Sequence, residues 1–383
     1  MSVLGFWLLA LAIYALVAII GGRRLIPIVG QLLVAAIAIP ALLLLWVEPH
    51  WQLSAQDLLA PTWLNLTYGL CFALLLGYIL SDVIDLDLSP ACLKIALPSF
   101  LVPMLAGLAC SLWLLPGERS WLSAVGIGLL FSITAIPVLY LFLQSIGYPA
   151  ADTKRLLHAA ILMEFLCWSL FGLAQGSSHP AALLWPLLAA ALPLLLHKVL
   201  RLRHGLFYSL PFFALMLLFQ QLKINALVFG IAYMLCLGWL RQPFVLPLPE
   251  RAWKLLMNGL AVPLILTFGV LRVDFHGIGQ DYSWLAIGML VLLPAISKVL
   301  GSWLGLHWAD PSAAARIKWH ESLLLNIRGL TEIVFLNLLL QLQLIDSLVY
   351  FGLLLMSLFS TLLPALLGKH ANNNEARSRY EVS

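Results

Sequence analysis

Long apolar runs are the feature of this sequence that most restricts how the chain can fold. Thirteen stretches consist mainly of hydrophobic side chains, and short polar segments separate them. They occupy residues 2–21, 25–47, 64–84, 92–115, 120–144, 154–174, 179–201, 205–221, 224–240, 252–271, 284–306, 316–342 and 346–367. A helix of about 20 apolar residues crosses a hydrocarbon core about 30 Å thick. We therefore expect each run to be a transmembrane helix.

The composition excludes the soluble classes of protein. Hydrophobic residues make up 62% of the 383 residues and charged residues only 10%, whereas soluble domains carry about 25% charged residues. Neither a soluble enzyme nor a nucleic-acid-binding protein has such a balance. None of the runs alternates with a period of two, which predicts helices and an all-α polytopic membrane protein. The five cysteines show no CxxC or Cys/His spacing, so we expect no metal site and no cofactor.

Basic residues indicate how the chain is oriented. When the loops are assigned alternately to the two membrane faces, one face collects 16 of the Lys and Arg residues and the other collects three. Such an excess marks the cytoplasmic side. The sequence therefore predicts a multi-pass protein of the inner (plasma) membrane, with its N-terminus outside and its C-terminus, including the tail 369–383, in the cytoplasm.

Four charged residues lie well inside the predicted spans, away from the span ends. They are Lys298, Arg328, Glu164 and Glu332, while Asp82 and Glu321 lie closer to span ends. A charge at the middle of a bilayer costs about 2.5–3.5 kcal/mol on insertion scales and therefore faces a partner or a water-filled cavity. These residues indicate an ion pathway through a membrane protein, which we expect to be a transporter and not an enzyme.

Two of the runs contain helix breakers near their centres. In the fifth run, Ser132 and Thr134 precede Pro137, which has no backbone N–H to donate. In the twelfth run, Gly329 lies among Asn326, Arg328 and Glu332.

If the seventh run, 179–201, is a linker, these two runs occupy equivalent positions in two inverted repeats, 1–174 and 205–367. Together with the linker they form one transmembrane domain, 1–368. Paired interrupted helices of this kind indicate a secondary-transporter site at the bilayer midplane.

The buried charges allow two interpretations. If the twelfth run were one continuous helix, Glu321, Arg328 and Glu332 would share a face, and the two acids would neutralise the guanidinium internally. Alternatively, Arg328 takes part in transport. Lys298 has no acid nearby on its own helix, so we expect it to pair with Glu164.

Five motifs resemble those of one membrane-protein family, the monovalent cation/proton antiporter superfamily, which includes Kef-type and sodium/proton antiporters. The segment 24–33 resembles the opening of its second helix, and 132–137 (SITAIP) resembles its discontinuous-helix motif. The segment 160–168 (AILMEFLCW) resembles its ion-binding helix. The segments 297–301 and 326–332 resemble its Lys-x-x-Gly and Arg-Gly-x-x-Glu signatures.

This resemblance implies a fold with thirteen helices, inverted repeats and two discontinuous crossing helices, and a homodimer. It implies exchange of protons for a monovalent cation, Na⁺ or K⁺, by alternating access. Glu164 takes the place of the essential aspartate of the family, while Met163 replaces its Asn or Asp. One carboxylate would then exchange one proton for one cation, which predicts electroneutral exchange.

The thioether of Met163 is a weak acceptor where an alkali ion prefers hard oxygen. Proton-coupled transport of an organic anion or metabolite on the same fold therefore stays an alternative, as does a transport-inactive membrane sensor or assembly subunit.

Overall fold

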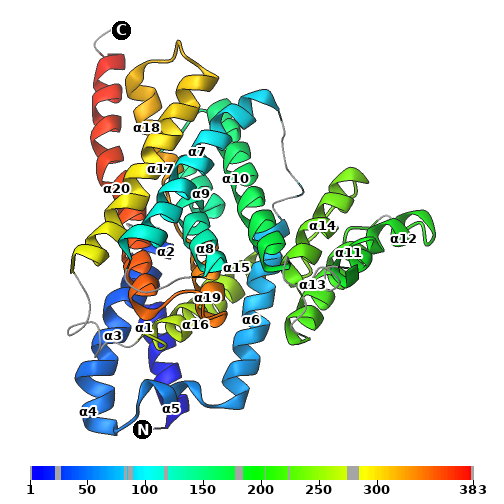
Figure 1. The fold of residues 1–383 in the computed structure, drawn as a ribbon, viewed down its shortest axis with the longest axis vertical. Coiled ribbons are helices and arrows are strands. Elements are labelled where there is room, and N and C mark those ends of the chain that lie inside the picture. The colour runs from blue at the N-terminus through cyan, green and yellow to red at the C-terminus, as the bar shows by residue number, and fades with distance from the viewer. Residues whose placement is uncertain are drawn as a thin grey trace.

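The computed structural model describes residues 2–21, 27–81, 84, 89–115, 120–176, 184–202, 204–222, 225–273 and 284–380. Every extended regular element in this part of the chain is a helix (Figure 1). The predicted all-α class is confirmed. Asp82, residues 24–26 and five of the basic loop residues fall outside the described segments. These five are Arg23, Arg24, Arg119, Arg203 and Lys223.

Seven helical segments are long and apolar enough to cross a membrane. They are α1 (Val3–Gly21), the segment from α2 (Pro27–Leu33) through α3 (Ile39–Leu42) to α4 (Glu48–Trp51), α6 (Thr62–Ser81), α7 (Pro90–Ala109) with its extension to Leu114, α10 (Ala150–Gly176), α15 (Glu250–Leu256) with α16 (Val262–Val270), and α17 (Trp284–Ala309). A bent pair, α18 (Ala315–Leu325) with α19 (Leu330–Gln341), forms one further candidate span.

Shorter apolar helices match the remaining runs. They are α8 (Trp121–Ser132), α11 (Leu184–Ala190) with α12 (Leu192–Lys198), α13 (Leu206–Gln221), α14 (Ala226–Trp239) and the first part of α20 (Ser347–Tyr380). The predicted linker helix is interrupted at Ala191, ahead of Pro193, because proline lacks the N–H that would continue the hydrogen-bond ladder. A total of thirteen spans and a division into inverted repeats stay predictions.

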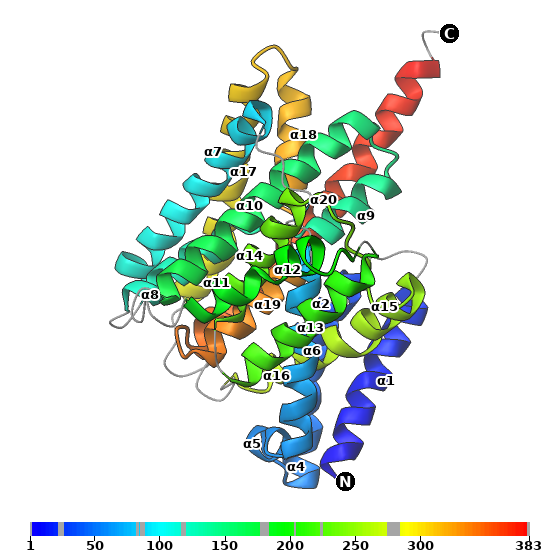
Figure 2. The same cartoon turned by 90° about the vertical axis from the view of Figure 1, so that its right-hand side faces the viewer.

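The helices form an elongated bundle. Figure 1 shows the N-terminus at one end, beside α4 and α5 (Ala55–Leu59), and the C-terminus of α20 at the opposite end. Figure 2 shows α7, α10 and α17 running in similar directions. The short helices α11 to α14 lie together on one side of the bundle in Figure 1, and this side faces the viewer in Figure 2.

Close packing of α17 against α7 fixes the position of Lys298. Gly301 and Gly305 follow Lys298 on α17 with the spacing Gly-x-x-x-Gly, which lets membrane helices approach closely. A Cβ atom at Gly301 would lie 2.5 Å from the carbonyl oxygen of Pro98 on α7, and one at Gly305 would lie closer still to the carbonyl oxygen of Ile95. Both glycines are therefore required by backbone contact.

We predict that Gly301→Ala and Gly305→Ala each lower the free energy of unfolding by about 1–3 kcal/mol, because an added methyl group must push α7 and α17 apart. Gly288→Ala on the same helix is the matched control, since a Cβ there meets nothing within 4 Å. Thermal unfolding of the purified protein in detergent measures all three. Equal melting temperatures for Gly288→Ala and Gly301→Ala would contradict the close approach.

Candidate ion-binding site

The first predicted break is present in the fifth run. Helix α8 ends at Ser132, and Ile133 takes extended backbone angles of φ −61° and ψ 145°. Residues 133–135 are not helical, and α9 (Ile136–Ser145) begins one residue before Pro137. Proline is well tolerated in the first turn of a helix, where its missing N–H is not needed. Pro137 thus belongs to the start of a second half-helix.

The second predicted break separates α18 from α19. Residues 326–329 lie between the two helices, whose axes differ in direction by 45°. Gly329 is needed here because space is short: a Cβ atom would lie 2.7 Å from Cγ2 of Val138 and 3.3 Å from Cβ of Ala135. The start of α19 therefore packs directly against the start of α9.

The two breaks are hydrogen-bonded to each other. The N–H of Ala135 donates to the carbonyl of Ile327 at 3.0 Å. The hydroxyl of Thr134 donates to the carbonyl of Leu325 at 2.9 Å. These contacts satisfy backbone groups that the missing turns leave open. The predicted pair of discontinuous crossing helices is therefore confirmed.

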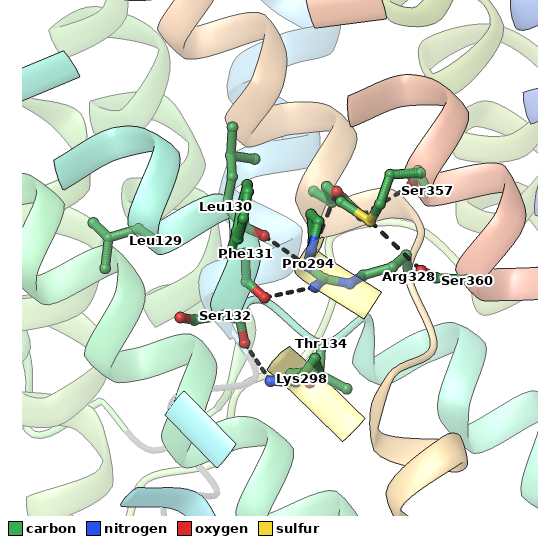
Figure 3. Close-up of polar contacts among 12 residues, drawn as sticks. Leu129, Leu130, Phe131, Ser132, Thr134, Pro294, Lys298, Arg328, Ser357 and Ser360 are labelled. Atoms are coloured by element: carbon green, nitrogen blue, oxygen red, sulfur yellow. Dashed lines mark hydrogen bonds and ion pairs between the residues drawn. The ribbon is translucent and has the colours of Figure 1, made fainter. Parts of the chain in front are cut away.

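Two buried cations bind the open end of α8 (Figure 3). The guanidinium of Arg328 donates to the carbonyls of Leu130 and Phe131, each at 2.6 Å, and the ammonium of Lys298 donates to the carbonyl of Ser132. Both cationic side chains are fully buried. The last carbonyls of a helix carry the negative end of its dipole, so cations are favoured there. Charge-assisted hydrogen bonds of this kind are about twice as strong as neutral ones.

Glu332 is the acid that accompanies Arg328. Its Oε1 atom lies 3.9 Å from a guanidinium nitrogen, and its Oε2 atom accepts from the hydroxyl of Ser357 at 2.9 Å. Thr361 donates to the carbonyl of Arg328 at 2.9 Å. The hydroxyl residues of α20 were missed by the sequence interpretation. Their presence in the otherwise apolar final run was the only signal.

The condition for a common face of Glu321, Arg328 and Glu332 is not met, and of the two acids only Glu332 lies beside Arg328. The condition is one continuous helix, whereas the break at 326–329 separates Glu321 from the other two. Glu321 instead pairs with Arg155 of α10 at 2.7 Å and accepts from the hydroxyl of Tyr148 at 2.9 Å.

Helix α10 brings Met163 and Glu164 to the breaks. Glu164 is 2% exposed, and its Oε1 atom accepts from the indole N–H of Trp168 one turn later, at 3.4 Å. The sulfur of Met163 lies 3.3 Å from the ammonium of Lys298. Within the described part of the chain, the ammonium contacts this thioether and one backbone carbonyl, and neither is a carboxylate. The expected coupling between Glu164 and Lys298 stays a prediction.

Several polar groups near the breaks can accept or donate further hydrogen bonds. The hydroxyl of Ser132 donates to the carbonyls of Phe100 and Gly128, at 2.8 and 3.2 Å, so it offers only its lone pairs to a ligand. Among the described residues, both polar atoms of the Asn326 amide and the hydroxyl of Thr331 are buried with no hydrogen-bond partner. A native protein rarely leaves buried polar groups in this state unless water or an ion occupies the site.

Comparison with known proteins shows that the chain is similar to cation/H⁺ antiporters. No protein-family model matches it. It is 25% identical over 346 residues to the cation/H⁺ antiporter 19 of Arabidopsis thaliana, covering 82% of this chain and 42% of that protein. It is 24% identical over 296 residues to the cation/H⁺ antiporter 15 of the same plant, covering 70% of this chain and 35% of that protein. The predicted resemblance to the monovalent cation/proton antiporter superfamily is confirmed.

A solved antiporter shares the fold. The sodium/proton antiporter MjNhaP1 of Methanocaldococcus jannaschii superposes with a TM-score of 0.58 over 95% of both chains, at 16% sequence identity. The chain spans less than half the length of the two plant antiporters.

We predict that Arg328→Met lowers the free energy of unfolding by about 3–5 kcal/mol, because it leaves a buried carboxylate and two helix-end carbonyls without their cation. Adding Glu332→Gln should recover only part of this loss, since the carbonyls of Leu130 and Phe131 stay open. Thermal unfolding of the single and double variants gives the comparison.

The control cycle is Arg155→Met with Glu321→Gln. That pair involves no helix end, so the double variant should recover most of what Arg155→Met loses. Full recovery in the Arg328 cycle as well would show that Arg328 serves only to neutralise Glu332.

Proposed function

We propose that the chain is a secondary active transporter that exchanges protons for a monovalent cation, Na⁺ or K⁺, by alternating access. The main support is the site itself: a buried carboxylate, Glu164, lies on α10, which packs against both interrupted helices, and these are joined at their breaks. Interrupted helices that meet at membrane depth are the usual setting of ion sites in secondary transporters. The similarity to cation/H⁺ antiporters supports the same function.

In this mechanism Glu164 is the exchangeable charge. It holds either a proton or the cation, and the indole of Trp168 orients one of its oxygens in both states. Asn326 and Thr331 supply hard oxygen ligands for an alkali ion. The hydroxyl oxygens of Ser132 and Thr134 can coordinate the ion as well, through their lone pairs. Lys298 and Arg328 stay on α8 and keep the crossing rigid.

Because one carboxylate takes either one proton or one monovalent cation, we propose electroneutral exchange. We further propose a homodimer in the plasma (inner) membrane, with the N-terminus outside and the C-terminus in the cytoplasm. The basic-residue asymmetry supports this orientation. The inverted repeats 1–174 and 205–367, joined by 179–201, are supported by the matching breaks at 133–135 and 326–329.

Transport of an organic anion is the second candidate, and the environment of Met163 favours it. A thioether stands beside the ammonium of Lys298 where the superfamily resemblance implies an amide or carboxylate, and two buried cations lie at the crossing. A proteoliposome assay with an internal pH dye separates the candidates. Pulses of Na⁺, K⁺ or Li⁺ move protons in the first case, and only organic ions do so in the second.

We predict that Glu164→Gln abolishes cation-driven proton movement while the protein stays folded, because the amide keeps the shape of the side chain without its titrating charge. Glu321→Gln is the matched control. That carboxylate is equally buried, but Arg155 and Tyr148 hold it, so exchange should persist. Normal exchange by Glu164→Gln would remove this carboxylate from the mechanism.

We predict opposite effects of Asn326→Leu on exchange and on stability. The KM for the cation should rise severalfold because a ligand oxygen is lost. The free energy of unfolding should stay the same or rise by about 1–3 kcal/mol, because an unsatisfied buried amide is removed.

Asn337→Leu on the same bent span serves as control. Its amide donates to the carbonyl of Ile333 at 3.0 Å and to the hydroxyl of Tyr350 at 3.4 Å, so the substitution should cost about 1 kcal/mol and leave KM unchanged. Loss of stability by Asn326→Leu with an unchanged KM would mean that the amide is structural.

A further inference from the structure

The contact between Met163 and Lys298 gives Met163 a role that its departure from the family pattern does not suggest. The two side chains come from α10 and α17, are both fully buried, and place sulfur and nitrogen 3.3 Å apart. The same ammonium donates to the carbonyl of Ser132 at the end of α8. One side chain thus connects three helices.

The chemistry of this contact determines how firmly the ammonium is held. A buried ammonium has three donors and is costly to leave unpaired. The carbonyl of Ser132 supplies a strong partner at the negative end of a helix, and the polarisable thioether supplies a weak and uncharged one. The charged and titratable groups that act on the ammonium are Arg328, Glu332 and Cys167. The carboxylate of Glu164 acts on the same thiol, that of Cys167.

An uncharged acceptor at position 163 has a specific consequence. A carboxylate there would attract the ammonium away from the carbonyl of Ser132, since charge-assisted pairs are the stronger ones. The ammonium would then be displaced whenever a cation bound that carboxylate, and its proton would join the exchange. A thioether attracts neither the ammonium nor an alkali ion strongly enough for this.

We propose that Met163 is a positioning residue that keeps Lys298 on the end of α8 as a fixed charge, so that proton and cation compete only at Glu164. This inference rests on the proposed function and deepens it. It assigns the one-for-one coupling to a particular contact between α10 and α17.

The first test uses the unmodified protein. Liposomes that contain the purified protein are given equal pH on both sides and a tenfold gradient of the cation that the protein exchanges. A membrane voltage is then imposed with a lipophilic ion, so that no potassium gradient is needed. We expect rates within about twofold at voltages of either sign, because one-for-one exchange moves no net charge. Exchange driven by voltage alone would overturn the inference and the electroneutral stoichiometry, and would leave the proposed exchange of protons for a monovalent cation intact. No proton movement with any monovalent cation would overturn the proposed function, and the inference with it.

The second test separates positioning from packing. Met163→Leu keeps the volume but removes the acceptor, so the ammonium is free to approach Glu164 and compete with the cation. We expect the KM for the cation to rise about tenfold with little change in kcat. Met163→Gln, which restores a neutral acceptor of similar length, should return KM to near its original value.

The double variant Met163→Leu with Lys298→Met completes the test. With no ammonium left to compete, the rise in KM caused by Met163→Leu should disappear, whereas a packing defect would persist. Met163→Asp should make exchange sensitive to voltage, because a second carboxylate then titrates. An unchanged KM in Met163→Leu, or a raised KM that survives in the double variant, would overturn the positioning role.

Discussion

Open helix ends are the constraint on which this structure depends. A helix interrupted inside a bilayer leaves carbonyl and N–H groups that lipid cannot satisfy. Here the two interrupted helices form some of the missing hydrogen bonds with each other. Ala135 and Thr134 donate to the carbonyls of residues 327 and 325. The last three carbonyls of α8 take charged donors from Arg328 and Lys298. The breaks therefore need the buried cations to bind their open carbonyls, and the buried cations need these carbonyls as hydrogen-bond acceptors.

In the proposed mechanism, the buried acids divide into a fixed charge, Glu332, and an exchangeable one, Glu164. Glu332 lies beside Arg328, on the same half-helix, and accepts from Ser357, so its charge is matched within the protein. Glu164 lies on a different helix, and the indole of Trp168 is a neutral donor. Binding a proton or a cation at Glu332 would break its ion pair with Arg328. In the proposed mechanism, this argues against Glu332 as the carrier.

The sequence predicted what local chemistry determines. Pro137 and Gly329 identified both breaks, and the apolar runs identified the membrane helices, because these features depend on neighbouring residues. Partners that depend on tertiary packing were not predictable. The expected role of Glu321 failed because the face argument required the continuous helix that Gly329 interrupts. Met163 and Lys298 are 135 positions apart, and Ser357 comes from the final helix, so no local pattern links them to the site.

A missing signature residue has to be judged together with its partner across the site. Met163 alone suggests a site that has lost an oxygen ligand. With Lys298 beside it, the thioether separates two tasks that a single carboxylate would combine, holding the ammonium and binding the cargo. The second task then needs oxygens from elsewhere. Among the described residues, the unpartnered amide of Asn326 lies on the second break and the unpartnered hydroxyl of Thr331 lies in the first turn of α19. Their unsatisfied state is costly for folding alone, which is the physical reason to assign them to a ligand.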